Sequence, residues 1–150
     1  SLNVNGYRGW RLTSARLEDF YLEAEFQTQQ CAGKDQYGLV FRAKDYESGQ
    51  AYYLAVSCDG QYKLTKWTGS GIATVKDWTV SDFINDGSNQ LNRIGIYAQD
   101  RNLTIYANDQ KVDELSDESL TSDGYIGFFV AGEEIYGFTA EVDSLSYWDR

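Results

Sequence analysis

Pairs of acidic residues carry the most obvious catalytic chemistry in this sequence. Hydrolysis of a glycosidic bond needs two carboxyl groups across the bond, about 5 Å apart in retaining enzymes and about 6.5–9.5 Å apart in inverting enzymes. Glu23 and Glu25 lie two residues apart, as do Glu141 and Asp143, so each pair would share one face of a β-strand. Acidic residues at this spacing also occur on the solvent-exposed face of an ordinary strand, so the two pairs do not by themselves predict an enzyme.

A second group of residues could bind a sugar. Sugar rings stack their C–H faces on Trp and Tyr, and a planar guanidinium with five donors can hold two vicinal hydroxyls or a carboxylate. Arg42 and Tyr53 fall on the outward-facing parity of neighbouring predicted strands, and Trp67 and Trp78 fall at strand ends or off the buried faces. We therefore predict a ligand site centred on Arg42 and Tyr53, with Trp67 and Trp78 at its rim. The alternative is that Arg42 is structural and pairs with a glutamate of the strand at residues 20–27.

Composition and charge exclude several classes of protein. The chain has 150 residues, a formal charge of −10 and no His. The missing His excludes a Ser-His-Asp triad and a His-ligated zinc site. The acidic charge argues against a nucleic-acid partner, because the chain has no electropositive footprint. No run approaches the roughly 18 apolar residues of a membrane span and no signal peptide is present, so we expect a part excised from a larger protein. Because no internal repeat, linker or low-complexity stretch occurs, we expect one domain over residues 1–150.

Short segments of alternating apolar and polar residues must position these side chains. Residues 20–27 alternate strictly, which predicts a strand with one buried face. Further strands are predicted at residues 38–42, 52–57, 62–64, 91–98, 103–107, 125–131 and 138–148, with a short strand at Val112 that is followed by a solvated loop. Asp59-Gly60 predicts a two-residue type I′ hairpin turn, and Asn108-Asp109 and Asp123-Gly124 are further turn signals. About ten strands at this spacing indicate a sandwich or a barrel.

An ordered series of short motifs resembles a known family. The series is Tyr37-Gly-Leu-Val-Phe-Arg42, Tyr52-Tyr53, Asp59-Gly-Gln-Tyr-Lys-Leu64, Leu103-Thr-Ile-Tyr-Ala-Asn108, Gly124-Tyr-Ile-Gly-Phe128 and Val142-Asp-Ser-Leu145. From Leu17 to Trp148 the chain is similar to the concanavalin A-like lectin/glucanase jelly rolls of laminin-G-like and DUF1080 domains, the latter also called 3-keto-disaccharide hydrolase-like. The resemblance implies an all-β, antiparallel two-sheet jelly-roll sandwich whose concave face often holds glycans.

From this resemblance we predict a lectin-like module that binds an oligo- or polysaccharide on its concave sheet. We expect it outside the cytoplasm, whether extracellular, at the cell surface or periplasmic. Two alternatives stay open, a non-catalytic sensor or protein-interaction domain of a larger cell-surface or signalling protein, and a glycoside hydrolase-like enzyme. Glycosidases of this fold often carry an E-x-D-x-x-E strand, and no such triplet occurs here, so the sequence does not predict an enzyme.

The two cysteines predict a disulfide between Cys31 and Cys58. Cys31 follows the strand at residues 20–27 and Cys58 ends the strand at residues 52–57, so an antiparallel meander would bring them to one edge. Strands two places apart are about 9.6 Å distant, beyond the roughly 7 Å limit for bridged Cα atoms. The segment Ala32–Gln36 would therefore have to arch over the middle strand. Two buried free thiols are the alternative.

No cofactor is required by the sequence, but the resemblance implies a structural calcium ion. Jelly rolls of this kind often carry one, and Ca²⁺ takes six to eight oxygen ligands. Asp19 and Asp143 are the candidates, since first and last strands commonly lie side by side in such folds. The alternative, which the charge of −10 favours, is that both are solvated surface carboxylates.

Overall fold

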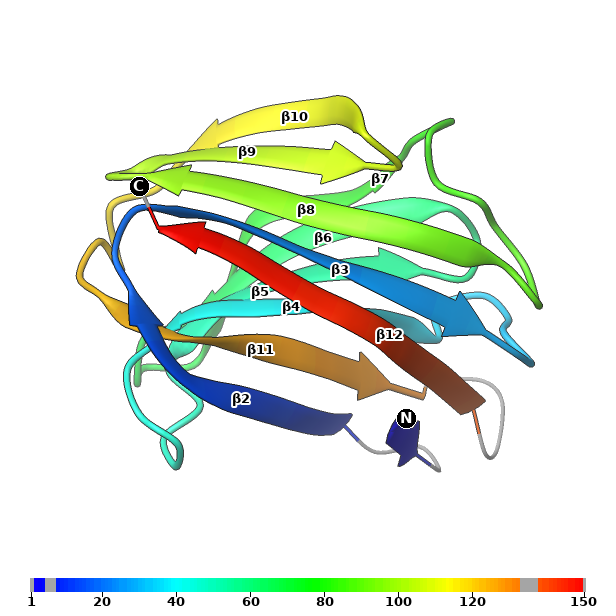
Figure 1. The fold of residues 1–150 in the computed structure, drawn as a ribbon, viewed down its shortest axis with the longest axis horizontal. Helices are drawn as coiled ribbons and strands as arrows, with labels where there is room; N and C mark the ends of the chain where they lie inside the picture. Colours follow the sequence, from blue (N-terminus) through cyan, green and yellow to red (C-terminus); the bar gives the residue numbers. More distant parts are fainter. Residues whose placement is uncertain (1, 5–7, 133–137, 150) are drawn as a thin grey trace.

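Two six-stranded antiparallel sheets lie face to face in the computed structural model, which describes residues 2–4, 8–132 and 138–149 (Figure 1). Sheet A contains, in spatial order, β1 (Leu2–Val4), β12 (Phe138–Asp149), β3 (Phe20–Thr28), β8 (Leu91–Gln99), β9 (Asn102–Ala107) and β10 (Gln110–Ser116). Sheet B contains β2 (Arg8–Leu17), β11 (Gly124–Ala131), β4 (Gln36–Ala43), β5 (Ala51–Ser57), β6 (Gln61–Trp67) and β7 (Ile72–Val80). The two-sheet antiparallel sandwich predicted from the sequence is confirmed.

The main core lies between the sheets and follows from the alternation in the strands. In β3 every second residue is buried, beginning at Phe20. The rings of Phe20 and Phe41 of β4 meet edge to face, with their centroids 6.0 Å apart. The Phe41 ring stacks on that of Tyr52 of β5, with a centroid distance of 5.2 Å. Burial of each such side chain contributes roughly 1.5–3 kcal/mol, so these alternating faces hold the two sheets together.

A second apolar cluster lies on the outer face of sheet B. Its buried members are Val40, Ala43, Ala51, Tyr53, Ala55 and Phe129, and the partly buried side chains packed against them are Trp10, Leu12, Trp67, Trp78 and Tyr125. In the ranges that the structure describes, no further layer of strands or helices covers this face. The residues at its centre are therefore shielded largely by the aromatic side chains around them.

The predicted disulfide is confirmed, but the geometry expected around it is wrong. Cys31 and Cys58 are bonded, with their Cα atoms 5.4 Å apart. Because β3 belongs to sheet A while β4 and β5 belong to sheet B, the three strands form no meander and no segment arches over a middle strand. The bridge instead joins the ends of the two sheets, where the Cys58 amide donates to the Asp35 carbonyl oxygen at 2.9 Å.

The tight turns differ in how far the sequence predicts them. Asn108 and Asp109 have φ values of 51° and 69°, as the type I′ turn between β9 and β10 requires. The β5–β6 loop contains three residues, Cys58 to Gly60. Gly60 has a positive φ of 83° but Asp59 does not, and the Gly60 amide donates a hydrogen bond to the Ser57 carbonyl oxygen at 3.1 Å. The type I′ turn predicted at Asp59-Gly60 is therefore wrong.

Three strands were not predicted, β1, β2 and β7. The pairing of β2 with β11 shifts register between Tyr125 and Gly127. The regular alternation of inward-facing and outward-facing residues along β2 is therefore interrupted, and the sequence lacks the pattern that predicts a strand. The edge strand β7 is mostly exposed and its pairing with β6 shifts register twice.

Within the described ranges, no helix is both long and apolar enough to cross a membrane.

Candidate functional site

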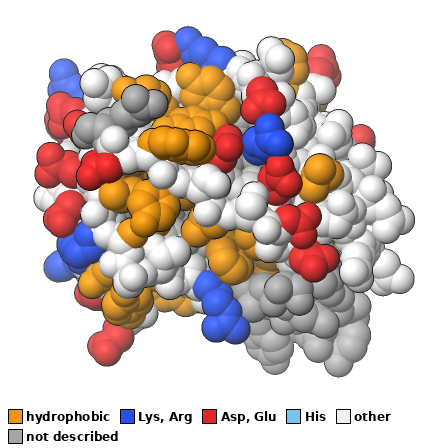
Figure 2. Space-filling view, viewed as in Figure 1, with side chains coloured by type: hydrophobic (Ala, Val, Ile, Leu, Met, Phe, Trp, Pro, Cys, Tyr) orange, Lys and Arg blue, Asp and Glu red, His pale blue; other side chains and the backbone are white. Residues whose placement is uncertain are grey.

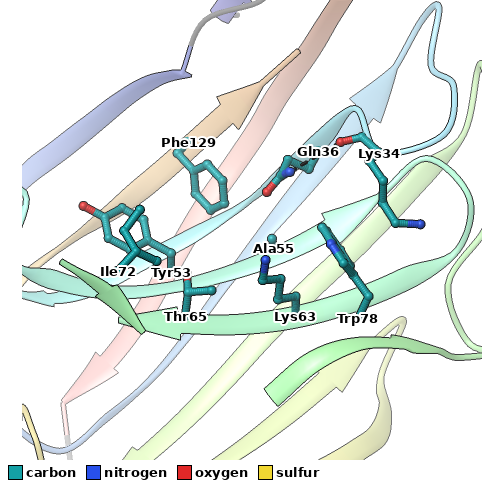
Figure 3. A pocket seen from close by; sticks show the side chains of 9 residues that line it. All are labelled: Lys34, Gln36, Tyr53, Ala55, Lys63, Thr65, Ile72, Trp78 and Phe129. Carbon is teal, nitrogen blue, oxygen red and sulfur yellow. Dashed lines mark hydrogen bonds between the residues drawn. The ribbon is translucent and has the colours of Figure 1, made fainter. Parts of the chain in front are cut away.

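A groove of about 330 Å³ opens on the outer face of sheet B (Figure 3). We call it the groove, and its lining residues are Lys34, Gln36, Tyr53, Ala55, Lys63, Thr65, Ile72, Trp78 and Phe129. They come from β4, β5, β6, β7 and β11 and from the loop before β4. Side chains far apart in the sequence thus meet on one surface.

Strand register explains why this surface is hollow. Ala55 of β5 pairs with Gly38 of β4 on one side and with Lys63 of β6 on the other. The two small residues form a low floor, and Tyr53, two residues from Ala55 on the same strand face, rises beside it. A larger residue at position 38 would not fit, because its Cβ would lie 1.7 Å from the Leu54 carbonyl oxygen.

One end of the groove is apolar. The rings of Tyr53 and Phe129 meet edge to face, with centroids 5.7 Å apart and an interplanar angle of 87°. The Tyr53 hydroxyl donates to the carbonyl oxygen of Gly49, which fixes the orientation of the ring. Ile72, which is 60% exposed, lies beside Tyr53 at this end in Figure 3. An apolar face of a ligand could rest here.

The other end of the groove is cationic. The ammonium groups of Lys34 and Lys63 lie 5.4 and 5.5 Å from the centroid of the Trp78 ring, within the range of a cation–π interaction. Figure 3 shows Trp78 between the two lysines. Lys34 also forms an ion pair with Asp59. The lining contains no Asp or Glu, although the chain carries 23 of them.

The structure brings together only part of the site predicted from the sequence. Tyr53 and Trp78 line the groove. Trp67 packs against the same apolar cluster and pairs with Ile72, so it lies beside the groove and outside its lining. Lys63 and Thr65 were not predicted as site residues, although they lie four and two residues before Trp67 on β6 and therefore share its strand face. The contribution of Lys34, which precedes its strand, has no signal in the sequence.

The predicted position of Arg42 on the outer face is wrong. Its side chain is buried, with the residue 2% exposed, and donates to the carbonyl oxygen of Glu18 at 2.8 and 3.1 Å and to that of Leu120 at 3.1 Å. A further hydrogen bond reaches the Asp100 carbonyl oxygen, and the Asp19 carboxylate is 3.5 Å away. Burial lowers the pKa of Arg42 from its ordinary value, and the nearby oxygens oppose that effect.

A β-bulge explains this reversal. Between the pairs Val40–Gly127 and Ala43–Tyr125, two residues of β4 face one residue of β11. Arg42 is the inserted residue with a positive φ of 52°, so its side chain turns inward beside that of Phe41. The alternation that the sequence argument assumed stops one residue before Arg42.

The acidic residues singled out in the sequence lie elsewhere. Glu25 on the outer face of sheet A pairs with Arg93 at 2.7 Å, and Glu23 accepts a hydrogen bond from Tyr21 at 3.0 Å. Neither therefore pairs with Arg42. Figure 2 shows the face over β3, β8 and β12, where acidic side chains border apolar patches. The groove, on the opposite sheet, has no such carboxylates in its lining.

The predicted pairing of Asp19 with Asp143 is also wrong. In the β3–β12 register Phe20 faces Asp149 while Phe26 faces Val142, so the two aspartates lie at opposite ends of the strands, about 20 Å apart. The Asp19 carboxylate accepts a hydrogen bond from the backbone amide of Asp100 at 2.8 Å. Among the described residues no group of three or more acidic or cysteine side chains could hold a metal ion. Calcium binding as such stays a prediction.

A second hollow, of about 420 Å³, lies at the end of the sandwich and is a weaker candidate. Its lining residues are Arg16, Arg42, Lys44, Gln50, Thr68, Ser119, Leu120, Thr121, Ser122 and Asp123. They include no aromatic residue on which a sugar ring could stack. The hydrogen bond from Arg16 at 3.1 Å lowers the pKa of Asp123, so this carboxyl is unsuited to act as a general acid.

Comparisons with known proteins agree with this architecture. The carbohydrate binding module CBM66 from Bacillus subtilis is 19% identical, with a TM-score of 0.78 over 96% of this chain and 83% of that one. A GH43 protein from Bacillus licheniformis is 13% identical, with a TM-score of 0.69 over 97% of this chain and 33% of that one. Sheep galectin-11 is 10% identical, with a TM-score of 0.58 over 99% and 100%. At these identities the likeness concerns the fold, and it confirms the predicted jelly roll.

The sequence itself identifies the family. No curated protein matches the chain at a significant level. Residues 2–139 match the 3-keto-alpha-glucoside-1,2-lyase-like domain, which covers most of the 150 residues and agrees with the resemblance noted in the sequence. The chain therefore belongs to the family of 3-keto-alpha-glucoside-1,2-lyase-like domains.

Proposed function

We propose that this chain is a non-catalytic carbohydrate-binding module that holds a glycan in the groove on sheet B. The observation that carries the proposal is the groove itself, a hollow with aromatic walls and polar side chains on a jelly roll similar to that of CBM66. Sites for small ligands are commonly concave, with aromatic walls and a few polar groups that fix orientation.

The lining residues offer the groups that a sugar needs. The rings of Tyr53 and Trp78 supply apolar surface for the C–H faces of a pyranose or furanose ring. Gln36 supplies an amide and Thr65 a hydroxyl, each able to donate to or accept from a sugar hydroxyl. Most of these side chains stand on paired strands, so little order has to be acquired when a ligand binds.

The chemistry of the groove favours binding over catalysis. Hydrolysis needs an acid and a second carboxylate across the scissile bond, and the lining offers neither. The family description names a lyase-like domain, so release of product from a polysaccharide panel is the measurement that would support an enzyme. A silent glycan array together with capture of a defined protein partner would support the sensor alternative.

We also propose that the module works outside the cytoplasm, as part of a longer protein. The Cys31–Cys58 disulfide supports this location, because disulfides persist in oxidising compartments and are rare in the reducing cytosol. If mass spectrometry of unreduced protein isolated from its source finds both thiols free, the location loses its main support.

A glycan array followed by calorimetry tests the function. We expect at least one glycan to bind and Trp78→Ala to weaken its binding by about tenfold or more, because Trp78 forms one wall of the groove. Trp148→Ala is the matched control, since Trp148 is 47% exposed and lies on β12 of sheet A. Loss of binding in the control but not in Trp78→Ala would move the site to sheet A. Failure of every glycan to bind would overturn the proposal.

A further inference from the structure

We propose that the glycan held in the groove is anionic, and that its carboxylate or sulfate group binds at the end formed by Lys34 and Lys63. This inference rests on the function proposed above. It concerns the chemical class of the ligand, which neither the family match nor the structural comparisons specify. Three features of the groove carry it.

The first feature is the sign of the charge. The chain has a net charge of −10, yet both charged residues in the lining of the groove are lysines. Charges on the exposed surface are screened beyond about 8 Å at physiological ionic strength, so a bound anion would respond mainly to these two ammonium groups and to the Asp59 carboxylate that is paired with Lys34. The groove is thus locally cationic on an acidic molecule.

The second feature is the pairing of the two lysines. Lys34 is partly neutralised by its ion pair with Asp59. Across the described ranges, Lys63 forms no ion pair, and its ammonium is placed only by the face of Trp78, 5.5 Å away. A cation held in a groove by an aromatic ring retains its charge for an incoming partner, and a carboxylate or sulfate would satisfy it with charge-assisted hydrogen bonds.

The third feature is preorganisation. The Lys34 and Lys63 ammonium groups both lie within 5.5 Å of the same Trp78 centroid, so their side chains are already restricted in the free protein. Lysine otherwise loses much side-chain entropy when it is fixed by a ligand. Trp78 therefore acts as a positioning residue for the two cations as well as a wall of the groove.

The shape of the groove assigns the rest of the ligand. Figure 3 shows Tyr53, Ile72 and Phe129 at one end and Lys34 and Trp78 at the other, with Lys63 next to Trp78 on the inner side of that cationic end. An acidic sugar unit has the matching arrangement, with an apolar C–H face and an anionic group at one edge. A neutral sugar would leave the Lys63 charge without a new partner.

Calorimetry with matched pairs of glycans tests this inference. The pairs are an oligogalacturonide and its carboxyl-reduced form, and a sulfated oligosaccharide and its desulfated form. We expect one charged member to bind about tenfold or more tightly than its neutral counterpart, and its affinity to fall as salt rises. Whichever pair shows the difference identifies carboxylate or sulfate as the anion.

Substitutions then locate the anion. We expect Lys63→Met to weaken binding of the charged glycan about tenfold and Lys63→Arg to retain most of it. Lys44→Met is the control, because Lys44 is an exposed lysine in the lining of the second hollow, and its loss changes the net charge equally. Loss of binding in Lys44→Met but not in Lys63→Met would overturn the assignment to the groove.

The outcomes separate this inference from the proposed function. Equal binding of charged and neutral members would overturn the anionic ligand while leaving a carbohydrate-binding module. If none of these four glycans binds while another, neutral glycan on the array does, the anionic ligand is likewise overturned, whereas failure of every glycan on the array overturns the proposed function itself. Circular dichroism of Lys63→Met, a change at a partly exposed position, confirms that any loss of binding occurs in a folded protein.

Discussion

The guanidinium group of Arg42 donates two hydrogen bonds to the carbonyl oxygen of Glu18, at 2.8 and 3.1 Å, and so ties β4 to the turn between β2 and β3. Its other hydrogen bonds reach the carbonyl oxygens of Asp100 and Leu120, which lie in two further loops. One buried cation therefore organises three chain segments at the same end of the sandwich. This arrangement predicts a role in stability and none in glycan binding.

Replacement of Arg42 by methionine tests that role. Because the substitution removes a buried side chain that donates hydrogen bonds to three carbonyl oxygens at once, we expect Arg42→Met to lower the free energy of unfolding by about 2–4 kcal/mol in urea titrations. Arg101→Met, at a side chain that is 60% exposed, should change it by less than about 0.5 kcal/mol. Glycan affinity of the folded fraction should match the wild type. An Arg42→Met protein that keeps its stability but no longer binds glycan would reverse the assignment.

The contrast between Arg42 and Tyr53 indicates how far the sequence predicts a site. Both were assigned outward by counting alternate residues from a buried neighbour. The count holds for Tyr53, because all six β4–β5 partners follow without a shift in register. It fails for Arg42, because a bulge inserts one residue opposite β11 and reverses the parity. A bulge depends on the partner strand, which the local sequence does not identify.

Burial of one face distinguishes the strands that the sequence predicts from those that it does not. Strands that bury one face, such as β3 and β9, alternate strictly and were predicted. The exposed edge strand β7 was not, because edge positions need no buried partner. The disulfide was predicted for the right pair of cysteines with the wrong topology, since nothing local to Cys31 indicates that the chain changes sheet after it. Assembly of the groove likewise depends on the order of strands.

The disulfide should stabilise the sandwich mainly by restricting the unfolded chain. Its cysteines are 27 residues apart, for which the chain-entropy relation gives about 3.5 kcal/mol. We expect the double variant Cys31→Ser, Cys58→Ser to lose roughly this amount in urea unfolding. Addition of a reductant should destabilise the wild type to the same extent and leave the variant unchanged. Coincident unfolding curves for wild type and variant without reductant would contradict the prediction.

Alkaline pH should destabilise the protein in part through Tyr62. Burial, followed by its hydrogen bond to Asp113 at 2.8 Å, raises the pKa of Tyr62 to about 12 from an ordinary value near 10. Between these values the unfolded tyrosine has lost its proton and the folded one has not, so the folded state binds more protons. Stability contributed by this group is complete below pH 10 and is lost as pH rises through about 12.

Tyr62→Phe isolates that contribution. The phenyl ring keeps most of the packing but cannot ionise, so the free energy of unfolding of the variant should fall less steeply above pH 10. The difference in slope should approach 1.4 kcal/mol per pH unit, the value for one proton. Unfolding midpoints in urea at half-unit pH intervals measure it. Parallel profiles for the two proteins would show that Tyr62 does not titrate differently in the folded and unfolded states.

Filling the groove provides a test that does not depend on the identity of any polar contact. Ala55 lies at the floor, 4% exposed, between Gly38 and Lys63 of the neighbouring strands. A phenylalanine at this position would project its ring into the open space of about 330 Å³. Because that space is empty of protein, we expect Ala55→Phe to lower stability by less than about 1.5 kcal/mol while reducing glycan affinity by about tenfold or more. Ala73→Phe is the matched control, since Ala73 is exposed on β7 and outside the lining of the groove. If Ala55→Phe binds glycan as tightly as the wild type and Ala73→Phe, the ligand occupies another surface, because a ring in the groove and a sugar cannot fill the same volume.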